Sequence, residues 1–287
     1  MTIRAAAAHF SLRFPFMRLT VTTWNINSVR LRIEQVRRFL ADVQPDVLCL
    51  QETKCPDNCF PLQALQSFGY PHVVQAGQKG YNGVAILSRF SLSDTEAMNF
   101  CERNDARHIG VRLGPDAGAA SGIAIHNFYV PAGGDVPDPD LNWKFAHKLA
   151  FLGEMRAWGA GARPAAAPAI LVGDLNVAPL ENDVWSHKQL LNVVSHTPVE
   201  TDALETLRQE AGWIDAARHL TPEPDKIYTW WSYRSPDWRA ADKGRRLDHI
   251  WLSPDLAEPL RAVDVARETR GWTRPSDHAP VTAILEL

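Results

Sequence analysis

The run Ala169-Ile170-Leu171-Val172-Gly173-Asp174-Leu175-Asn176 joins a short apolar, strand-like stretch to a polar cluster. Beyond the end of a strand, the i and i+2 spacing can point Asp174 and Asn176 to the same side while Leu175 turns toward the core. An aspartate in that place can accept a proton from water, and a neighbouring amide can orient the water or a phosphate. The same residues also fit an Asx turn, in which they only satisfy loop backbone groups. The pattern alone favours neither interpretation.

Three further strand-like runs carry a polar cluster at one end. They are Leu19 to Thr23 with Trp24-Asn25-Ile26-Asn27, Val47 to Leu50 with Gln51-Glu52-Thr53-Lys54, and Ala279 to Leu285, which follows Ser276-Asp277-His278. Polar groups at strand ends of an α/β sheet gather along one rim, where such folds usually place their sites. The four clusters together suit the binding of one metal-bound phosphate.

Segments of helical period alternate with strand-like segments, which is typical of an α/β architecture. Helices are expected at 29–43, 141–158 and 201–211, and further strands at 70–75, 83–87, 108–113, 123–130, 228–231, 247–252 and 259–266. The clusters span residues 25 to 278, so a division of the chain would separate them. We therefore expect a single domain over residues 17–287, built from two packed sheets flanked by helices.

The composition is that of an ordinary globular protein, with 45% hydrophobic and 22% charged residues among 287. No apolar run approaches the roughly 20 residues of a membrane helix, so no membrane association is expected. The formal net charge of −3 gives no overall attraction to nucleic acid. Binding to a polyanion would therefore need a local basic patch or a metal ion.

The four cysteines lack the paired short spacing of a zinc site, and we expect them to be structural free thiols: Cys49, Cys55, Cys59 and Cys101. No disulfide framework and no export segment is implied, so the expected compartment is a reducing cytoplasm. Residues 1–16 are too short and broken for a signal peptide. We expect them to be a disordered or misassigned extension, with Met17 beginning the folded domain, which mass spectrometry of protein from the native host would test.

Glu52 lies one residue past a strand that is predicted to be buried, where a carboxylate is costly unless it is hydrated, paired or bound to a cation. Mg²⁺ suits such a place, because it uses one or two carboxylates and takes its other ligands from water and phosphate oxygens. The alternative is a surface glutamate at a strand end.

Asp277 and His278 are adjacent before the final strand. Alternating strand geometry points neighbouring side chains apart, so Asp277 is not expected to orient His278. Asp248 is the better candidate, and we expect it to hold His278 in the charged or correctly tautomeric state that contacts a phosphate oxygen.

In order and spacing, seven segments together resemble the exonuclease III family of AP endonucleases, within the endonuclease/exonuclease/phosphatase superfamily. They are 24–27, 50–54, 77–85, 129–131, 173–176, 246–248 and 276–280, and the resemblance covers essentially residues 17–287. It implies a four-layered α/β sandwich and a Mg²⁺-dependent phosphodiesterase, with Mn²⁺ as a substitute. The implied reaction is DNA repair cleavage 5′ to abasic sites, with 3′-phosphodiesterase and 3′ to 5′ exonuclease action as further activities.

The resemblance also implies roles for individual residues. Five catalytic positions are implied. Tyr129 and His278 contact the phosphate, and Asp248 is the partner of His278. Asp174 activates the water, and Asn176 lies beside Asp174. The metal-side positions are Asn25, Asn27, Glu52 and Asp277, joined by Asp174, Asn176 and His278. The DNA contacts are Lys79, Arg107, Trp230 and Arg246. The implied partner is double-stranded DNA with abasic sites or blocked 3′ ends, bound by a monomer in the bacterial cytoplasm or nucleoid.

The chain departs from the family pattern at one point, because Ala132 follows Tyr129-Val130-Pro131 where the family often has an amide side chain. A phosphate or base contact is therefore expected to be absent there. Asn25 and Asn27 are neutral, where some relatives carry an aspartate, so the number of metal ions is left open.

The segment 226–246 is basic and aromatic. It carries six basic and two acidic residues, a surplus of 6 − 2 = 4, interleaved with five tyrosines and tryptophans. Arginines can hold phosphates while an aromatic ring fills the gap left by a missing base, and the resemblance places Trp230 beside the abasic sugar. The alternative is that the rings belong to the core and the charges to a solvated loop.

The sequence leaves two other functions open. A superfamily phosphatase acting on lipid or inositol headgroups is disfavoured by the segment 226–246. A DNA-damage-binding protein without catalysis is disfavoured by the complete set Glu52, Asp174, Asn176 and His278. The segment 179–198 is expected to cap the site.

Overall fold

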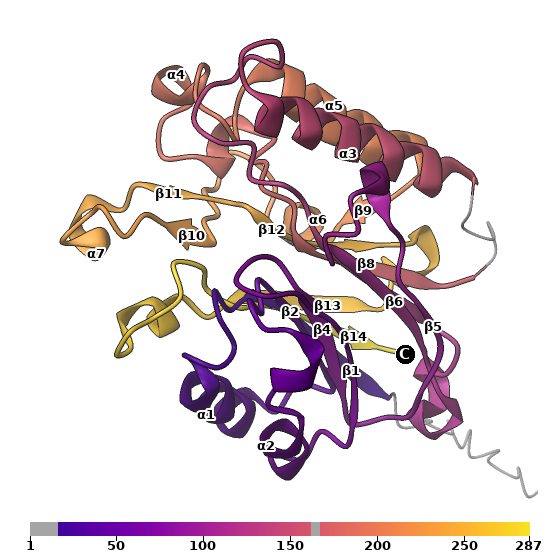
Figure 1. Ribbon diagram of the computed structural model, residues 1–287. Coiled ribbons are helices and arrows are strands. Elements are labelled where there is room, and N and C mark those ends of the chain that lie inside the picture. Colours follow the sequence, from indigo (N-terminus) through magenta and orange to yellow (C-terminus); the bar gives the residue numbers. More distant parts are fainter. Residues whose placement is uncertain (1–16, 162–166) are drawn as a thin grey trace, which may run out of the picture.

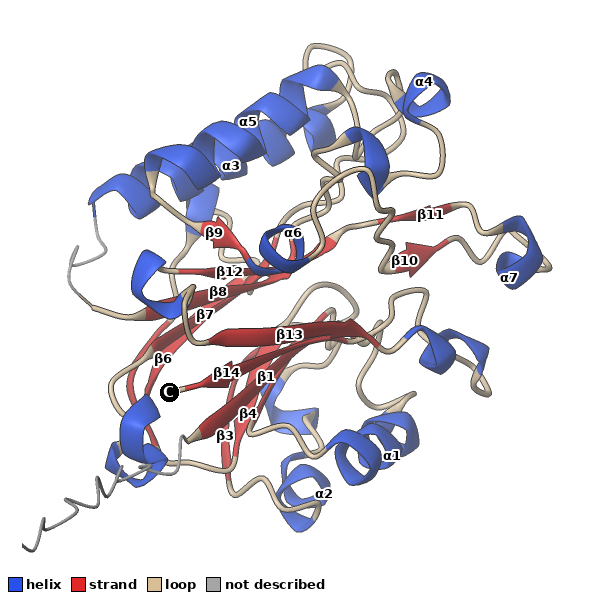
Figure 2. Cartoon of the chain, turned by 180° about the vertical axis from the view of Figure 1, so that it is seen from behind, coloured by secondary structure: helices blue, strands red, loops and turns tan. Residues whose placement is uncertain are grey.

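The computed structural model describes residues 17–161 and 167–287. The extension predicted over residues 1–16 therefore lies outside the described residues. Figure 1 shows the path of the chain, and Figure 2 shows its strands and helices from behind.

Two six-stranded mixed sheets form the centre of the molecule. The first has the order β13-β14-β1-β2-β4-β3, with strands β13 Leu260–Val265, β14 Val281–Glu286, β1 Arg18–Asn25, β2 Val47–Gln51, β4 Val84–Ser88 and β3 His72–Ala76. The second has the order β5-β6-β7-β8-β12-β9, with strands β5 Leu92–Glu96, β6 His108–Leu113, β7 Ala124–Tyr129, β8 Ala169–Asp174, β12 Asp248–Leu252 and β9 Ile214–Asp215. In each sheet one central pair is parallel, β1 with β2 and β7 with β8.

Helices cover the outer faces of both sheets (Figures 1 and 2). On the first sheet they are α1 Ile33–Val43 and α2 Leu62–Ser67, and on the second α3 Trp143–Gly161 and α5 Pro198–Glu210; the short helices α4 His187–Leu190, α6 Ala216–Leu220 and α7 Trp238–Ala241 lie elsewhere, with α7 beyond the main sheets. Single 3₁₀ turns lie at Asp57–Cys59, Phe100–Glu102, Pro115–Ala120, Glu181–Asp183, Pro254–Leu256 and Arg267–Gly271. A small two-stranded sheet, β10 Trp230–Trp231 with β11 Gly244–Arg245, projects beyond the main sheets.

Alternation along the strands explains the layers. In β1, Leu19 and Val21 pack between the sheets, whereas Trp24 packs against α1. In β8, Ile170 and Val172 face the inter-sheet core, whereas Leu171 packs toward α3 and α5. Helix, sheet, sheet and helix therefore form four layers, which confirms the predicted α/β sandwich.

Strand polarity brings the polar clusters to one rim. β1, β2 and β8 end there, while the antiparallel strands β12 and β14 begin there. In the second sheet Asp248 lies opposite Asp174, and Tyr129 lies on the other side of Asp174. Polar clusters that are far apart in sequence therefore meet at this rim, because the strand ends place them there.

All four cysteines are free. Within residues 17–161 and 167–287, no helix combines the length and apolar character needed to cross a membrane.

Candidate active site

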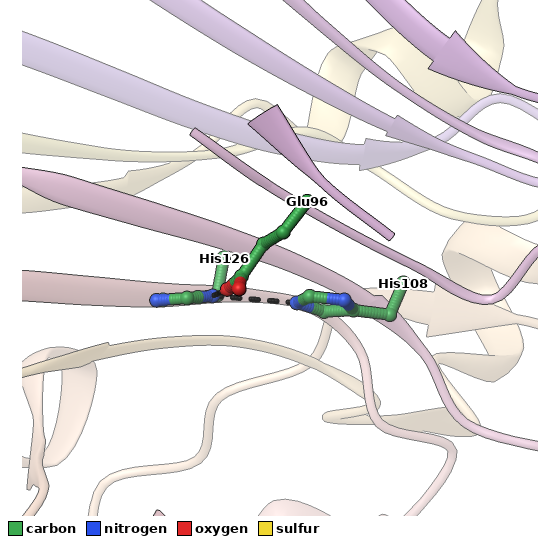
Figure 3. A group of neighbouring side chains, drawn as sticks. All are labelled: Glu96, His108 and His126. Carbon is green, nitrogen blue, oxygen red and sulfur yellow. Dashed lines mark hydrogen bonds and ion pairs between the residues drawn. The ribbon is translucent and has the colours of Figure 1, made fainter. Parts of the chain in front are cut away.

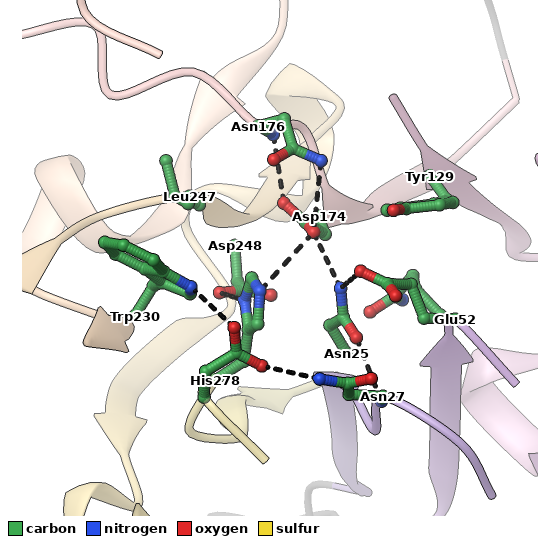
Figure 4. Close-up of polar contacts among 12 residues, drawn as sticks. Asn25, Asn27, Glu52, Tyr129, Asp174, Asn176, Trp230, Leu247, Asp248 and His278 are labelled. Carbon is green, nitrogen blue, oxygen red and sulfur yellow. Dashed lines mark hydrogen bonds and ion pairs between the residues drawn. The ribbon is translucent and has the colours of Figure 1, made fainter. Parts of the chain in front are cut away.

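Side chains from both sheets converge at this rim (Figure 4). The first sheet supplies Asn25 at the end of β1, Glu52 just after β2, and Asp277 and His278 before β14. The second sheet supplies Tyr129 at the end of β7, Asp174 and Asn176 at the end of β8, and Asp248 at the start of β12. The site therefore depends on the packing of one sheet against the other.

The Asp174 carboxylate lies at the centre of the cluster and is 1% exposed. Its Oδ2 accepts hydrogen bonds from Asn25 Nδ2 at 2.8 Å and from Asn176 Nδ2 at 3.2 Å, and its Oδ1 accepts one from the Asn176 backbone amide. Burial raises the pKa of Asp174 to about 7, against the attraction of the His278 cation. A carboxyl with this pKa gains or loses a proton near neutral pH, as a general base requires.

His278 lies between two carboxylates. Its Nδ1 is 2.8 Å from Asp248 Oδ2, and its Nε2 is 3.7 Å from Asp174 Oδ2. Burial opposes a charge on the imidazole, but the two carboxylates outweigh burial and raise the pKa of His278 to about 10. The ring is therefore a cation at neutral pH, and an imidazolium has no lone pair to offer a metal ion. In this state His278 can donate a hydrogen bond to an anion such as a phosphate.

We predict that the His278 imidazole stays protonated throughout the neutral range. An NMR titration in EDTA should show one histidine, identified by its absence from His278→Gln, that keeps the chemical shifts of a protonated imidazole between about pH 5 and pH 8. In Asp248→Asn the loss of the anion destabilises the imidazolium, so the same resonances should shift at lower pH. A midpoint near the ordinary value of about 6.5 in the unsubstituted protein would contradict this assignment.

Glu52, Asn27 and Lys54 lie together on one side of the cluster. The Lys54 ammonium is 2.6 Å from Glu52 Oε2 and 2.7 Å from Asn27 Oδ1, so a cationic group already bridges these two oxygens. Burial opposes the charge of Glu52, but Lys54 and a 2.9 Å hydrogen bond from Asn25 outweigh it and lower the pKa of that carboxyl. Carboxylate and amide oxygens of this kind are ligands that a hard divalent cation prefers.

Asn25 and Asp277 differ in what they present to the site. Asn25 turns its amide nitrogen toward both Glu52 and Asp174, so in this conformation it orients two carboxylates and does not offer them its oxygen. Asp277 accepts hydrogen bonds from Asn27 Nδ2 at 3.0 Å and from Trp230 Nε1 at 3.0 Å. It therefore connects Asn27 to the aromatic segment 226–246.

The cluster opens into a cavity of about 820 Å³. Residues of the polar cluster line it together with members of the basic aromatic segment: Glu52, Asn176, Asp277, His278, Trp230, Arg234, Lys243 and Arg245. The Arg245 guanidinium lies 5.2 Å from the centre of the Trp230 ring, because the two residues are paired in the β10–β11 register. Trp185 and residues 193–195 also line this cavity, so part of segment 179–198 reaches the site.

The structure corrects the expectation that Arg246 contacts DNA. Its side chain is 1% exposed and forms ion pairs with Asp183 and Asp215, both at 2.7 Å. Because neighbouring side chains on an extended segment face opposite ways, Arg245 faces the cavity beside Trp230 while Arg246 turns inward. Arg245 replaces Arg246 in the candidate binding surface.

The other two predicted DNA contacts lie in loops at the same rim. Lys79 is exposed in the loop between β3 and β4. Arg107 is held by Asp105, donates a 3.2 Å hydrogen bond to the Tyr129 carbonyl, and lies 4.8 Å from the centre of the Tyr129 ring. Burial and the neighbouring Glu52 and Asp174 carboxylates raise the pKa of Tyr129 well above its usual value, so its hydroxyl remains a hydrogen-bond donor.

Comparison with known proteins agrees with this arrangement. The model of the endonuclease/exonuclease/phosphatase family matches residues 22–278. The chain belongs to this family. Exodeoxyribonuclease III of Haemophilus influenzae is 31% identical over 269 residues, which cover 91% of this chain and 97% of that protein.

Solved structures of family members match over nearly the same span. An AP endonuclease from Archaeoglobus fulgidus is 32% identical with a TM-score of 0.86, covering 94% of this chain and all of the other. A 3′ phosphatase from Neisseria, solved with a product DNA hairpin, is 34% identical with a TM-score of 0.85 and the same coverage. These matches confirm the resemblance to the exonuclease III branch of the endonuclease/exonuclease/phosphatase family.

Sequence reasoning about this endonuclease/exonuclease/phosphatase member missed two groups in the site. Lys54 lies in the segment 50–54, which does not indicate a role for it by sequence alone. The basic and aromatic pattern of 226–246 does not distinguish Arg245 from its neighbour Arg246. The signal that could have separated the two arginines is strand alternation counted back from Asp248, but residues 246–247, between β11 and β12, belong to no strand.

A second group of histidine and glutamate side chains lies apart from this site (Figure 3). Glu96 and His126 flank Gly110 in register on three neighbouring strands, and His108 lies beside them. The Met98 amide donates to His108 Nδ1 at 3.2 Å, so the proton of this neutral ring is on Nε2, 3.3 Å from His126 Nδ1. That proton occupies the space between the facing nitrogens, so the group is better described as a hydrogen-bonded row than as a metal site.

Proposed function

We propose that this protein is a metal-dependent DNA repair phosphodiesterase that hydrolyses the backbone 5′ to abasic sites. The observation that carries the proposal is one cavity lined both by Glu52, Asn176 and His278 and by the Trp230–Arg245 pair. The first group suits phosphate hydrolysis, and the second suits a nucleic-acid backbone with a missing base. The names of the relatives, an exodeoxyribonuclease, an AP endonuclease and a 3′ phosphatase seen with DNA, agree with it.

The residues present fit a divalent metal ion. The Lys54 ammonium already binds between Glu52 and Asn27, whose oxygens would hold Mg²⁺ or Mn²⁺ with the help of Asp277. When bound, such an ion neutralises phosphate charge and acts as a Lewis acid. We propose Mg²⁺ as the resident ion because the donors are all oxygens, with Mn²⁺ as a substitute.

We propose separate roles for the remaining residues. Asp174 accepts a proton from the attacking water, and Asn176 holds that carboxylate and the water in place. The His278 cation and the Tyr129 hydroxyl donate to the phosphate oxygens that gain negative charge. General base help supplies roughly 3 to 5 kcal/mol of the 8 to 23 kcal/mol that enzymes need, so these donors are required as well.

The proposed substrate is double-stranded DNA with an abasic site or a blocked 3′ end. We propose that residues 17–287 act as one catalytic domain and as a monomer, within a reducing cytoplasm that suits four free cysteines. Light scattering of the purified protein, alone and with DNA, measures its oligomeric state.

Trp230 should discriminate damaged from intact DNA. We expect Trp230→Ala to weaken binding to a duplex with one abasic site roughly 10-fold or more, because stacking on an aromatic ring is worth about 1 to 3 kcal/mol. Trp230→Phe keeps a ring but loses the hydrogen bond to Asp277, and should lose less. Fluorescence anisotropy with abasic and intact duplexes measures both variants. An equal loss on both duplexes would show that Trp230 does not read the missing base.

One assay separates the candidate functions. Purified protein is given a duplex with a single tetrahydrofuran abasic analogue, or a soluble inositol phosphate, each with Mg²⁺ and with EDTA. Metal-dependent incision of the duplex and an unchanged inositol phosphate support the proposal. Hydrolysis of the inositol phosphate alone would support the headgroup phosphatase, and binding of the duplex without cleavage would support a damage-binding protein.

Binding that does not weaken with salt would argue against a DNA groove, since each neutralised phosphate contributes about −0.9 to the slope of log affinity against log salt.

A further inference from the structure

Three residues of the candidate site have left-handed backbone conformations, with φ of 47° at Asn27, 49° at Glu52 and 52° at Asn176. Such conformations are uncommon outside glycine and persist where the surroundings fix them. The carbonyl of each residue accepts a hydrogen bond: that of Glu52 from the Ser28 amide at 2.7 Å, that of Asn27 from Arg32, and that of Asn176 from the Lys148 ammonium at 2.7 Å. The Asn176 carbonyl is thus bound by a side chain from a distant helix.

Lys148 lies in α3 and is 0% exposed. Its ammonium also pairs with the carboxylate of Glu200, which is likewise fully buried near the start of α5. The other oxygen of Glu200 is occupied by the backbone amides of Ser195 and Thr197, at 2.7 and 3.1 Å. Glu200 therefore holds one side of the ammonium, and the Asn176 carbonyl holds another.

The aliphatic part of Lys148 is fixed as well. Gly133, with φ of 90°, lies so close that a Cβ there would be 2.9 Å from Lys148 Cδ. Gly133 belongs to the loop after β7, which also carries Ala132 on the wall of the active-site cavity. Lys148 therefore contacts the loop after β7, the loop after β8 and the start of α5 at once.

Stability alone does not account for this arrangement. Burying an ammonium and a carboxylate carries a desolvation penalty that their attraction often fails to exceed, and a well-packed apolar pair can serve stability equally well. An apolar pair cannot donate a hydrogen bond to the Asn176 carbonyl. We infer that Lys148 is a positioning residue, which fixes the Asn176 backbone so that the Asn176 side-chain amide stays against Asp174. This inference rests on the proposed function.

The contacts of Asn176 show which group Lys148 would keep in place, namely the Asn176 side-chain amide. The Asn176 side-chain nitrogen donates to Asp174 Oδ2 at 3.2 Å and to the Val130 carbonyl at 2.8 Å, so a shift of its backbone moves the amide relative to the proposed base. A displacement of about 1 Å in such a group can lower a rate as much as 10²-fold. We expect about a tenfold loss of kcat when Lys148 is removed. KM should change little, because Trp230 and Arg245 lie on separate elements.

The test is a double-mutant cycle in a background where Lys148 can be removed without leaving the buried Glu200 carboxylate unpaired. Glu200→Gln serves as the reference, and Lys148→Met and Asn176→Ala are added to it singly and together. The kcat of abasic-duplex incision and the thermal midpoint are measured for all four proteins. With Asn176 present, Lys148→Met should lower kcat about tenfold. With Asn176→Ala, it should lower kcat less than about twofold, since the amide that Lys148 positions is gone.

Equal losses in both halves of the cycle, or no loss in either, would overturn the inference, because Lys148 would then act on the whole fold or not at all. If the Lys148→Met protein does not fold, Lys148→Gln in the same background replaces it. Its amide can pair with the side-chain amide that Glu200→Gln introduces, but it ends one bond short of the ammonium position. Asn176→Ala in the otherwise unaltered protein reports on the proposed function separately. Full incision activity of that Asn176→Ala protein would show that Asn176 itself has no role in catalysis. A large loss of kcat in that protein, together with additive effects in the double-mutant cycle, would show only that Lys148 does not act through Asn176.

Discussion

Replacing Asp174 with asparagine is expected to lower kcat for abasic-duplex incision on the order of 10³-fold, with KM changed by less than about threefold. The physical reason is that the amide cannot accept the proton of the attacking water, and general base help is worth about 10²- to 10⁴-fold. Binding should persist because the Trp230–Arg245 surface and the metal-side oxygens are unaltered. Single-turnover incision with excess enzyme measures the chemical step directly.

Asp264→Asn provides the matched control. It makes the same change of charge at an exposed position on β13, away from the cavity, and should leave kcat unaltered. Thermal unfolding of both variants shows whether the fold is kept. Asp174→Asn protein that is folded, binds DNA and incises at more than about a tenth of the original rate would remove Asp174 from the role of base.

His278→Ala is expected to lower kcat on the order of 10²-fold, which is a typical loss when a donor to developing negative charge is removed. Asp248→Asn should lower kcat about tenfold in the unaltered protein, because the imidazolium loses the carboxylate 2.8 Å from its Nδ1. In the His278→Ala background the same change should have less than about a twofold effect. Asp248 would then act through His278, as the distance between them suggests.

His219→Ala is the control for this pair, since His219 is exposed on α6 and should not affect the rate. Additive losses from the two substitutions would show that Asp248 acts independently, for example through its 2.6 Å hydrogen bond from Thr229. The alkaline limb of the pH–rate profile provides a second readout. It should move to lower pH in Asp248→Asn, because the protonated form of His278 is then less favoured.

Much of the fold could be predicted from periodicity. The strand expected at 108–113 is β6 itself, and the strand expected at 123–130 contains β7. Both segments are apolar and bounded by turn residues, so the local sequence is enough to predict each of these strands. The helix expected over 29–43 begins only at Ile33, because residues 29–32 form a turn in which Arg32 is drawn toward the Asn27 and Arg274 carbonyls.

The strand β5 Leu92–Glu96 had no such signal. Four of its five residues are exposed, so its sequence is polar and lacks the alternation that predicts a strand. Pairing with β6 at the edge of the sheet decides its conformation. Tertiary contacts of this kind are not visible in a short segment of sequence.

The same distinction holds for the site, where some features follow from strand positions in the sequence and others from tertiary contacts. Strand ends predicted that Asp174, Glu52 and His278 would share a rim, because that follows from sheet topology. Which arginine faces outward follows instead from the Trp230–Arg245 register, and the role of Lys148 follows from a contact between α3 and the loop after β8. Neither is a property of local sequence.

The origin of the oxygen added during incision tests the central claim most directly. A duplex with one natural abasic site is incised in H₂¹⁸O, and the products are weighed by mass spectrometry. Water attack on phosphorus breaks the bond to the 3′ oxygen, so we predict ¹⁸O on the 5′-phosphate of the abasic fragment and a 3′-hydroxyl on the upstream fragment. An upstream fragment that ends in an unsaturated sugar, with no ¹⁸O on the phosphate of the downstream fragment, would mean that the strand breaks by elimination and would contradict the assignment of this site as a hydrolase.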